Sequence, residues 1–168
     1  MITITSGLLG VFFACAAAVE SESPHVQDSA AKAAINHVVD DWHQAAAAAD
    51  AERYFKYFTP DAVFMGTDAT ERWTRDEFYR YAKPYFDKGK AWSFKPAKRK
   101  VTIGPDGKVA WFDEELDTPN LGPARGSGVL VRQGDDWKIA QYNLSVPIPN
   151  EIFKEIKEQI GKALKAKK

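Results

Sequence analysis

The spacing of the hydrophobic residues changes once along this chain, close to Lys90. Before Lys90 these residues recur at steps of three and four, which is the pattern of helices with one buried face. After it they alternate with polar residues at a step of two, as in strands with one buried face. Because helices and strands are segregated rather than alternating, the pattern predicts an α+β domain whose long antiparallel sheet curls round the helices.

Three helices are expected before the change of spacing, over residues 31–49, 51–58 and 74–88. Asp28 or Ser29 can cap the first. Thr74, with Glu77 three residues later, forms a capping box for the third. A short apolar strand, 62–65, is expected between the second and third helices.

Four strands are expected after the change of spacing. They span residues 92–103, with an interruption at Pro96, and then 108–116, 125–132 and 137–146. Pro105-Asp106-Gly107 and Gly134-Asp135 supply turns for hairpins. These strands are predicted to form an antiparallel meander.

Residues 1–19 carry no charged side chain, and their apolar run from Leu8 to Ala14 is followed by small residues. This order is typical of a secretory signal peptide, and the run is shorter than the roughly 20 apolar residues that span a bilayer. We therefore expect a signal peptide over 1–19, a linker over 20–27, and a periplasmic or secreted protein. Membrane contact is expected only through this leader or through a lipid on Cys15, which would make the protein a lipoprotein.

The 168 residues carry 23 basic and 23 acidic side chains, so the formal net charge at pH 7 is zero. A neutral chain lacks the general attraction to phosphate backbones, which argues against a nucleic-acid partner. One group of basic residues is expected to be a solvated strand surface: Lys95, Lys98, Arg99 and Lys100. No phosphate-binding glycine loop or zinc motif is present, and no cofactor is predicted.

Four segments resemble the SnoaL-like group of the nuclear transport factor 2 superfamily, and the resemblance covers about residues 28–148. They read DAVFMGTD at 61–68, VAWFDEEL at 109–116, RGSGVL at 125–130 and WKIAQYNLS at 137–145. The resemblance implies a cone-shaped barrel made by a strongly curved antiparallel sheet around three N-terminal helices, with an apolar pocket inside. Members include isomerases, cyclases, dehydratases and domains without catalysis, so the resemblance implies a shape and leaves the chemistry open.

The catalytic groups of ketosteroid isomerase, a member of that superfamily, are not retained. Trp42 stands where the resemblance places the tyrosine that donates to the oxyanion, and Gly66 stands where it places the carboxylate base. Glycine cannot transfer a proton, which argues against an isomerase of that type. Asp68 could replace the base only if its turn folded inward.

Polar residues on the strands are expected to face the interior of the cone. The predicted ligand-binding residues are Trp42, Trp73, Trp111, Arg125, Ser127, Gln141 and Asn143. Asp113 and Glu115 share a strand face with Trp111. A buried Arg125 would be paired with these carboxylates, because a lone buried charge is costly. The group could orient an anionic or carbonyl-bearing ligand, or form a structural network at the mouth of the cone.

The catalytic candidates are His43, Asp68, Asp113 and Glu115. His43, close to Asp40 on the first helix, could be a general base in a pocket, or it could pair with a carboxylate on the helix surface. His37 lies six residues before His43, so the two do not stack on one helix face and no metal site is predicted.

Residues 149–168 are predicted to form an extra amphipathic helix, with an apolar stripe made by Ile152, Ile156, Ile160 and Leu164 among lysines. The stripe is expected to pack on the outer face of the sheet or on a partner subunit. A less favoured alternative is an anionic membrane surface. A homodimer is expected by analogy with the superfamily.

Three functions remain open for this chain. The first is an exported domain that binds a small hydrophobic or aromatic molecule in its internal pocket. The second is an enzyme of the same fold, an isomerase, cyclase or dehydratase that acts on a carbonyl-containing small molecule. The third is a homodimeric assembly domain without catalysis, which a cone filled by side chains would favour.

Overall fold

The computed structural model describes residues 24–166. The predicted signal peptide, Cys15 and the first part of the predicted linker therefore lie outside the described residues. The elements, in chain order, are α1 (Pro24–Ala47), α2 (Ala51–Phe55), β1 (Phe58–Met65), β2 (Arg72–Thr74), α3 (Arg75–Asp87), β3 (Lys95–Ile103), β4 (Val109–Thr118), β5 (Gly122–Gln133), β6 (Asp136–Ser145), the 3-10 turn η1 (Asn150–Ile152) and α4 (Phe153–Ala166).

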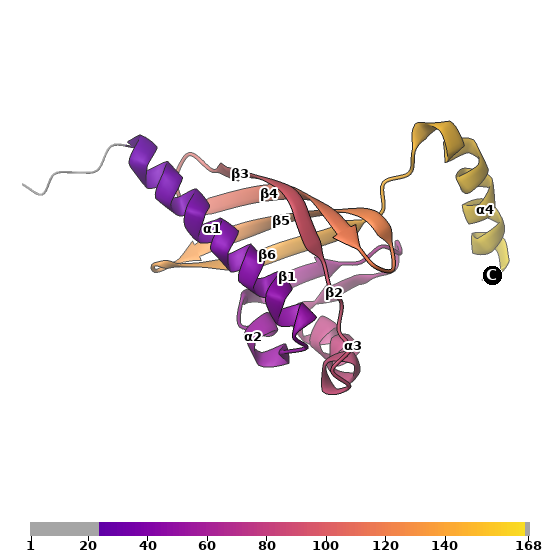
Figure 1. Cartoon of the computed structure of the whole chain (residues 1–168), viewed down its shortest axis with the longest axis horizontal. Coiled ribbons are helices and arrows are strands. Elements are labelled where there is room, and N and C mark those ends of the chain that lie inside the picture. The colour runs from indigo at the N-terminus through magenta and orange to yellow at the C-terminus, as the bar shows by residue number, and fades with distance from the viewer. Residues whose placement is uncertain (1–23, 167–168) are drawn as a thin grey trace, which may run out of the picture.

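One curled sheet holds all six strands in the order β2-β1-β6-β5-β4-β3 (Figure 1). The strands β3 to β6 form the predicted antiparallel meander. β1 extends the sheet by pairing in parallel with β6, and β2 pairs antiparallel with β1. The α+β, cone-like architecture is confirmed, with a mixed sheet that does not close into a barrel.

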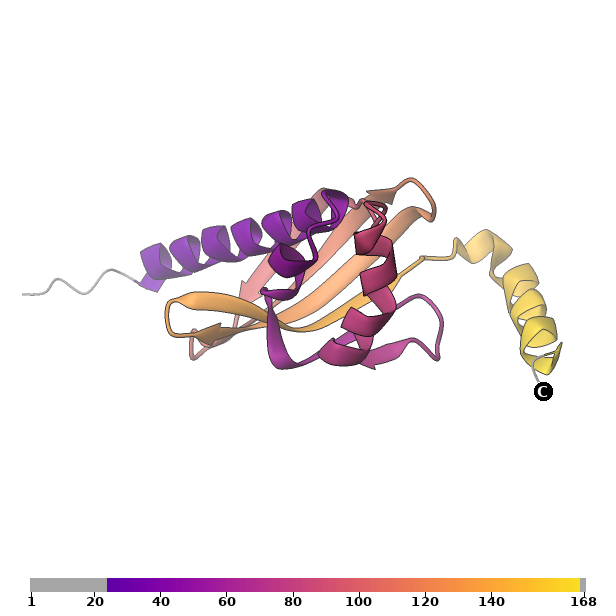
Figure 2. The same cartoon turned by 90° about the horizontal axis from the view of Figure 1, so that it is seen from below.

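Helices α1 and α3 cover the concave face of the sheet, as Figure 2 shows from a second direction. α1 packs against β3 and β6, and α3 packs against β1 and β2. Between them lies an aromatic core in which the Trp42 ring is 4.9 Å from that of Tyr54 and 4.6 Å from that of Tyr142, centroid to centroid. Pairs of this kind each add about 0.5–1.5 kcal/mol beyond the burial of their surface.

The helix limits differ from expectation at two places. α1 begins at Pro24, inside the segment predicted as a linker, so neither Asp28 nor Ser29 caps it. Phe58 begins β1 instead of ending α2, since the chain turns out of the helix at Lys56. The capping box of Thr74 and Glu77 is confirmed, because each side chain bonds to the backbone of the other residue.

The two faces of β4 decide which side chains reach the interior. Strict alternation buries Phe112, Glu114 and Leu116 and leaves Asp113 and Glu115 exposed on the outer face. On β6, Ala140 is the extra residue of a bulge, because Val129 pairs with Gln141 while the next residue, Leu130, pairs with Ile139. The bulge reverses the alternation after Ile139 and turns Tyr142 inward.

The last helix forms as predicted, but none of its described side chains is buried. Figures 1 and 2 both show α4 standing clear of the sheet, beyond the end of β6. Of the alternatives expected for its apolar stripe, packing on the outer face of this sheet is therefore wrong. Within residues 24–166, no helix is both long and apolar enough to cross a membrane.

Candidate functional site

An aromatic cavity of about 280 Å³ lies at the end of the sheet where β1, β4 and β6 finish. Its walls are Phe64, Gly66, Thr67, Glu71, Trp73, Phe78, Tyr81, Tyr85, Trp92, Ser93, Phe94, Thr118, Pro119, Asn120, Leu121 and Leu144. An apolar cavity of about 150 Å³ can hold benzene, so this one has room for a ligand of one or two rings. This end of the cone is therefore open, whereas its middle is filled by the aromatic core.

Helix α3 supplies one wall of the cavity because Phe78, Tyr81 and Tyr85 recur at steps of three and four on one of its faces. Phe78 stacks on Phe64 at 3.8 Å between centroids, and Tyr81 stacks on Trp73 at 4.7 Å. The rings of Tyr81 and Tyr85 are about half exposed and lie at the mouth. The wall is thus built from mutually packed rings, which hold one another in place.

Glu71 is the one charged residue that lines the cavity among the described residues. Its Oε2 accepts a hydrogen bond from the backbone N–H of Asp68 at 3.1 Å. A Cβ atom on Gly66 would overlap this carboxylate, so glycine at position 66 leaves the space that Glu71 occupies. The carboxylate therefore lies beside the position where the resemblance to the isomerase placed the catalytic base.

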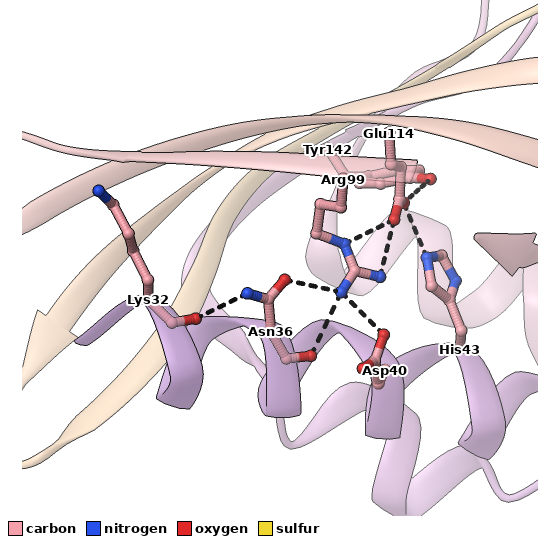
Figure 3. Close-up of polar contacts among 7 residues, drawn as sticks. All are labelled: Lys32, Asn36, Asp40, His43, Arg99, Glu114 and Tyr142. Atoms are coloured by element: carbon pink, nitrogen blue, oxygen red, sulfur yellow. Dashed lines mark hydrogen bonds and ion pairs between the residues drawn. The ribbon is translucent and has the colours of Figure 1, made fainter. Parts of the chain in front are cut away.

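A second group of polar residues is buried between α1 and the sheet, centred on Glu114 (Figure 3). Glu114 is 1% exposed, and its Oε1 lies 2.8 Å from His43 Nε2 and accepts the Tyr142 hydroxyl at 3.1 Å. Its Oε2 accepts a hydrogen bond from Arg99 Nε at 2.9 Å and forms an ion pair with Arg99 Nη2 at 2.8 Å. Gly126, opposite Glu114 on β5, carries no Cβ that would overlap the Tyr142 hydroxyl.

Arg99 connects this group to helix α1. Its Nη1 donates to Asp40 Oδ1 at 2.8 Å and to the side-chain and backbone oxygens of Asn36 at 3.2 and 3.3 Å. Figure 3 shows the guanidinium between Glu114 on one side and α1 on the other. A buried carboxylate and a buried guanidinium are tolerated here because each is paired and hydrogen-bonded.

The environment of Glu114 favours its ionised form. Burial by itself raises the pKa of Glu114, but the hydrogen bond and charge of His43 and the charge of Arg99 outweigh burial and lower this pKa. Burial and the Glu114 carboxylate raise the pKa of Tyr142 well above its ordinary value, so Tyr142 is a neutral donor. A carboxylate facing Nε2 holds the proton of a neutral His43 on that nitrogen and leaves Nδ1 as the basic atom.

His43 also lines a second cavity, of about 410 Å³, between α1 and the segment from Ser93 to Pro96. Ser93 and Phe94 line both cavities, and the Phe94 ring stands 5.9 Å from the His43 ring, centroid to centroid. The aromatic cavity and the histidine are therefore separated by the thickness of one side chain.

Most of the predicted site residues do not reach either cavity. Trp73 lines the aromatic cavity, whereas Trp42 is 1% exposed within the core. Asp68 lies in the exposed turn after β1, where its Oδ1 accepts from the backbone N–H and the hydroxyl of Thr70. The expectation that the following residues face the interior is wrong, because they lie on the outer face of the sheet: Trp111, Asp113, Glu115, Arg125, Ser127, Gln141 and Asn143.

An arginine does pair with a carboxylate in the interior, but these are not the predicted residues. The buried pair is Arg99 with Glu114, while Arg125 is exposed beside Glu115 on the outer face. The sequence did indicate that Glu114 faces inward, because it lies two residues from both Phe112 and Leu116 and so shares their face of the strand. His43 pairs with this distant glutamate rather than with Asp40, and nothing in the local sequence indicated that contact.

Comparison with known proteins places this architecture in a family. Residues 35–149 match the family described as the SnoaL-like domain. No curated protein sequence matches the chain. An NTF2-like protein of unknown function from Pseudomonas putida KT2440 superposes with a TM-score of 0.63 at 18% identity, over 73% of this chain and 91% of that one.

Two further structures share the fold. One, from Streptomyces avermitilis, is described as a proposed dehydratase of the NTF2-like family and has a TM-score of 0.60 at 15% identity, over 73% of this chain and 99% of that one. The other, from Novosphingobium aromaticivorans, is described as a proposed aromatic ring hydroxylase and has a TM-score of 0.60 at 17% identity, over 74% and 92%. The family match covers most of the chain, and the chain therefore belongs to the SnoaL-like domain family.

Proposed function

We propose that this protein binds a small aromatic molecule that presents a hydrogen-bond donor to Glu71. The observation that carries the proposal is the 280 Å³ cavity, which is lined by seven aromatic side chains and, among the described residues, by one charged side chain, that of Glu71. Pockets of this composition bind apolar ligands and orient them through a few polar groups. The apolar leader supports a periplasmic or secreted location.

The carboxylate of Glu71 determines which hydrogen-bonding group and which charge the ligand can carry. A carboxylate only accepts hydrogen bonds, so the group that meets Glu71 must be a donor. Aromatic faces attract cations as well, which favours an amine over a carboxylate on the ligand. The expected anionic or carbonyl-bearing ligand depended on Arg125, and that side chain lies on the outer face. The proposed ligands are therefore neutral or cationic aromatic molecules that carry a hydrogen-bond donor.

Binding of three probes tests this proposal: phenethylamine, indole and phenylacetate, titrated and followed by calorimetry. Phenethylamine and indole are expected to bind more tightly than phenylacetate. In the Glu71→Gln variant, the difference in affinity between phenethylamine and phenylacetate is expected to become smaller. Trp73→Ala removes a wall and is expected to weaken binding by about tenfold or more. Trp111→Ala is the matched control, since Trp111 is exposed on the outer face. Equal binding of all three probes, or binding unaffected by Trp73→Ala, would contradict the proposal.

A second candidate function is an enzyme acting on a carbonyl-containing molecule, and the observation that favours it is the pairing of His43 with Glu114. With the proton held on Nε2, His43 Nδ1 can accept a proton from a carbon beside a carbonyl group, and the electron pair of that C–H bond becomes an enolate. The resulting imidazolium is stabilised by Glu114, which lies 2.8 Å from Nε2. Return of the proton to another carbon would complete an isomerisation.

Exchange of the α-protons of 2-indanone in D2O, followed by NMR, tests the second candidate. Wild-type protein is expected to accelerate the exchange, and His43→Gln to remove the acceleration. His37→Gln is the control, because His37 is exposed on the same helix. If His43→Gln accelerates the exchange of the α-protons as much as wild type does, the enzyme hypothesis fails while the binding proposal is unaffected.

A cone filled by side chains would have favoured the third function, a homodimeric assembly domain without catalysis. The cavity at the end of the sheet does not favour it.

A further inference from the structure

Helix α4 presents an apolar stripe that no described part of the chain covers. The stripe consists of Phe153, Ile156, Ile160 and Leu164, which recur at steps of three and four. Phe153, Ile160 and Leu164 are 53%, 49% and 57% exposed. Outside its own preceding turn, η1, the helix packs closely on no other element of the described chain. Such a surface costs free energy in water and needs an occupant.

The charges around the stripe select the kind of occupant. Residues 150–168 hold six lysines and three glutamates, so this segment is positive within a chain that is neutral overall. Lys154, Lys157, Lys162 and Lys165 lie off the stripe, on the polar side and borders of the helix. A short helix with one apolar face and a lysine-rich polar face has the composition of helices that lie in the surface of an anionic bilayer.

The position of α4 also connects it with the aromatic cavity. β6 ends at Ser145, one residue after Leu144, which lines the cavity. The exposed rings of Tyr81 and Tyr85 and the side chain of Leu121 stand at the same mouth. Figure 1 shows α4 (yellow) leaving the body from this end. A surface that held α4 would therefore lie near the entrance to the cavity.

We propose that α4 docks this protein on anionic lipid bilayers, with the apolar stripe inserted among the lipid chains and the lysines facing the headgroups. The cavity mouth is then held near the membrane, where apolar ring compounds concentrate. The bilayer is preferred to a second copy because positive charge on the helix is complementary to anionic headgroups. On the outer sheet face, by contrast, Asp113 lies opposite Lys100 and Glu115 pairs with Lys98.

Co-sedimentation of the full chain with vesicles tests this proposal. Vesicles of phosphatidylcholine containing phosphatidylglycerol are compared with vesicles of phosphatidylcholine alone. Wild type is expected to bind the anionic vesicles. The affinity of the double variant I160Q/L164Q for these vesicles is expected to be lower by about tenfold or more. The variant K157Q/K162Q is expected to lose a similar factor on anionic vesicles only. All proteins carry the same residues 1–23, so the differences report α4.

A matched control makes the same kind of change elsewhere. V109Q/W111Q replaces two exposed apolar residues on the outer sheet face and is expected to bind vesicles as wild type does. The proposal is overturned if wild type does not bind anionic vesicles, or if I160Q/L164Q binds them equally well. It is also overturned if sedimentation velocity finds a wild-type dimer that I160Q/L164Q converts to monomers, because the stripe would then cover a second copy.

Discussion

The difference between Glu114 and Glu115 shows how much one position along a strand matters. The two residues are adjacent and chemically identical, yet Glu114 is 1% exposed and paired with His43 and Arg99 while Glu115 lies on the outer face. Side chains on a strand alternate between faces, so consecutive residues meet opposite environments. The energetic role of each glutamate follows from its face and not from its chemistry.

Replacing Glu114 is expected to destabilise the protein strongly. Glu114→Gln keeps the shape but leaves the buried Arg99 guanidinium with less compensating charge, and breaking a buried pair costs about 3–5 kcal/mol. Urea unfolding monitored by tryptophan fluorescence measures this loss. Glu115→Gln is the control and is expected to change stability by less than about 0.5 kcal/mol. Similar losses in the two variants would contradict the assigned role of the buried carboxylate.

The same carboxylate predicts how stability depends on pH. The pKa of Glu114 is lowered in the folded protein relative to its ordinary 4.5, because His43 and Arg99 outweigh the effect of burial. The unfolded state therefore binds a proton at higher pH than the folded state does. The stabilisation is complete above about pH 4.5 and is lost as pH falls through the folded-state value.

Unfolding free energies measured between pH 6 and pH 3 check this dependence. Wild type is expected to lose stability on acidification, and Glu114→Gln to lose less because its side chain does not titrate. Part of the slope persists in the variant, since the hydrogen bond from Arg53 also lowers the pKa of Asp41. Parallel curves for the two proteins would show that Glu114 does not contribute.

At the scale of elements, the sequence predicts a feature correctly where the residues that form it are close together in the chain. The third helix starts where Thr74 and Glu77 predict it, because both partners of the capping box lie within four residues. The bulge at Ala140 is different, since only the pairing of β6 with β5 reveals it. That single extra residue placed Gln141 and Asn143 outside and Tyr142 inside.

Removal of the α3 cap is expected to have a modest effect. Thr74→Ala loses the hydrogen bond from the Glu77 backbone, and such losses cost about 1 kcal/mol. The midpoint of thermal unfolding should fall by a few degrees. Thr102→Ala is the control, because Thr102 is exposed on β3 and does not cap a helix. No change in Thr74→Ala would mean that α3 is held by its packed face alone.

For the whole molecule, the distribution of burial separates a stable body from an appended helix. The core lies between the sheet and the helices α1 to α3, and α4 contributes no buried side chain. A chain ending at Pro149 is therefore expected to unfold at the same temperature as the full chain, in a calorimetric scan without lipid. A large decrease would show that α4 packs on the body in solution.

The sequence by itself determined the helices, the four strands of the meander and the aromatic character of the core, because periodicity, caps and turns depend on residues close together in the chain. It predicted neither β2 nor the parallel pairing of β1 with β6. Only the tertiary structure decided which strand face looks inward, how the bulge redirects β6, and that Arg99 of β3 meets Glu114 of β4 and His43 of α1. These outcomes depend on contacts across 15 and 71 residues of chain, which local patterns do not encode. Alternation specifies two faces, and only packing against the helices selects one.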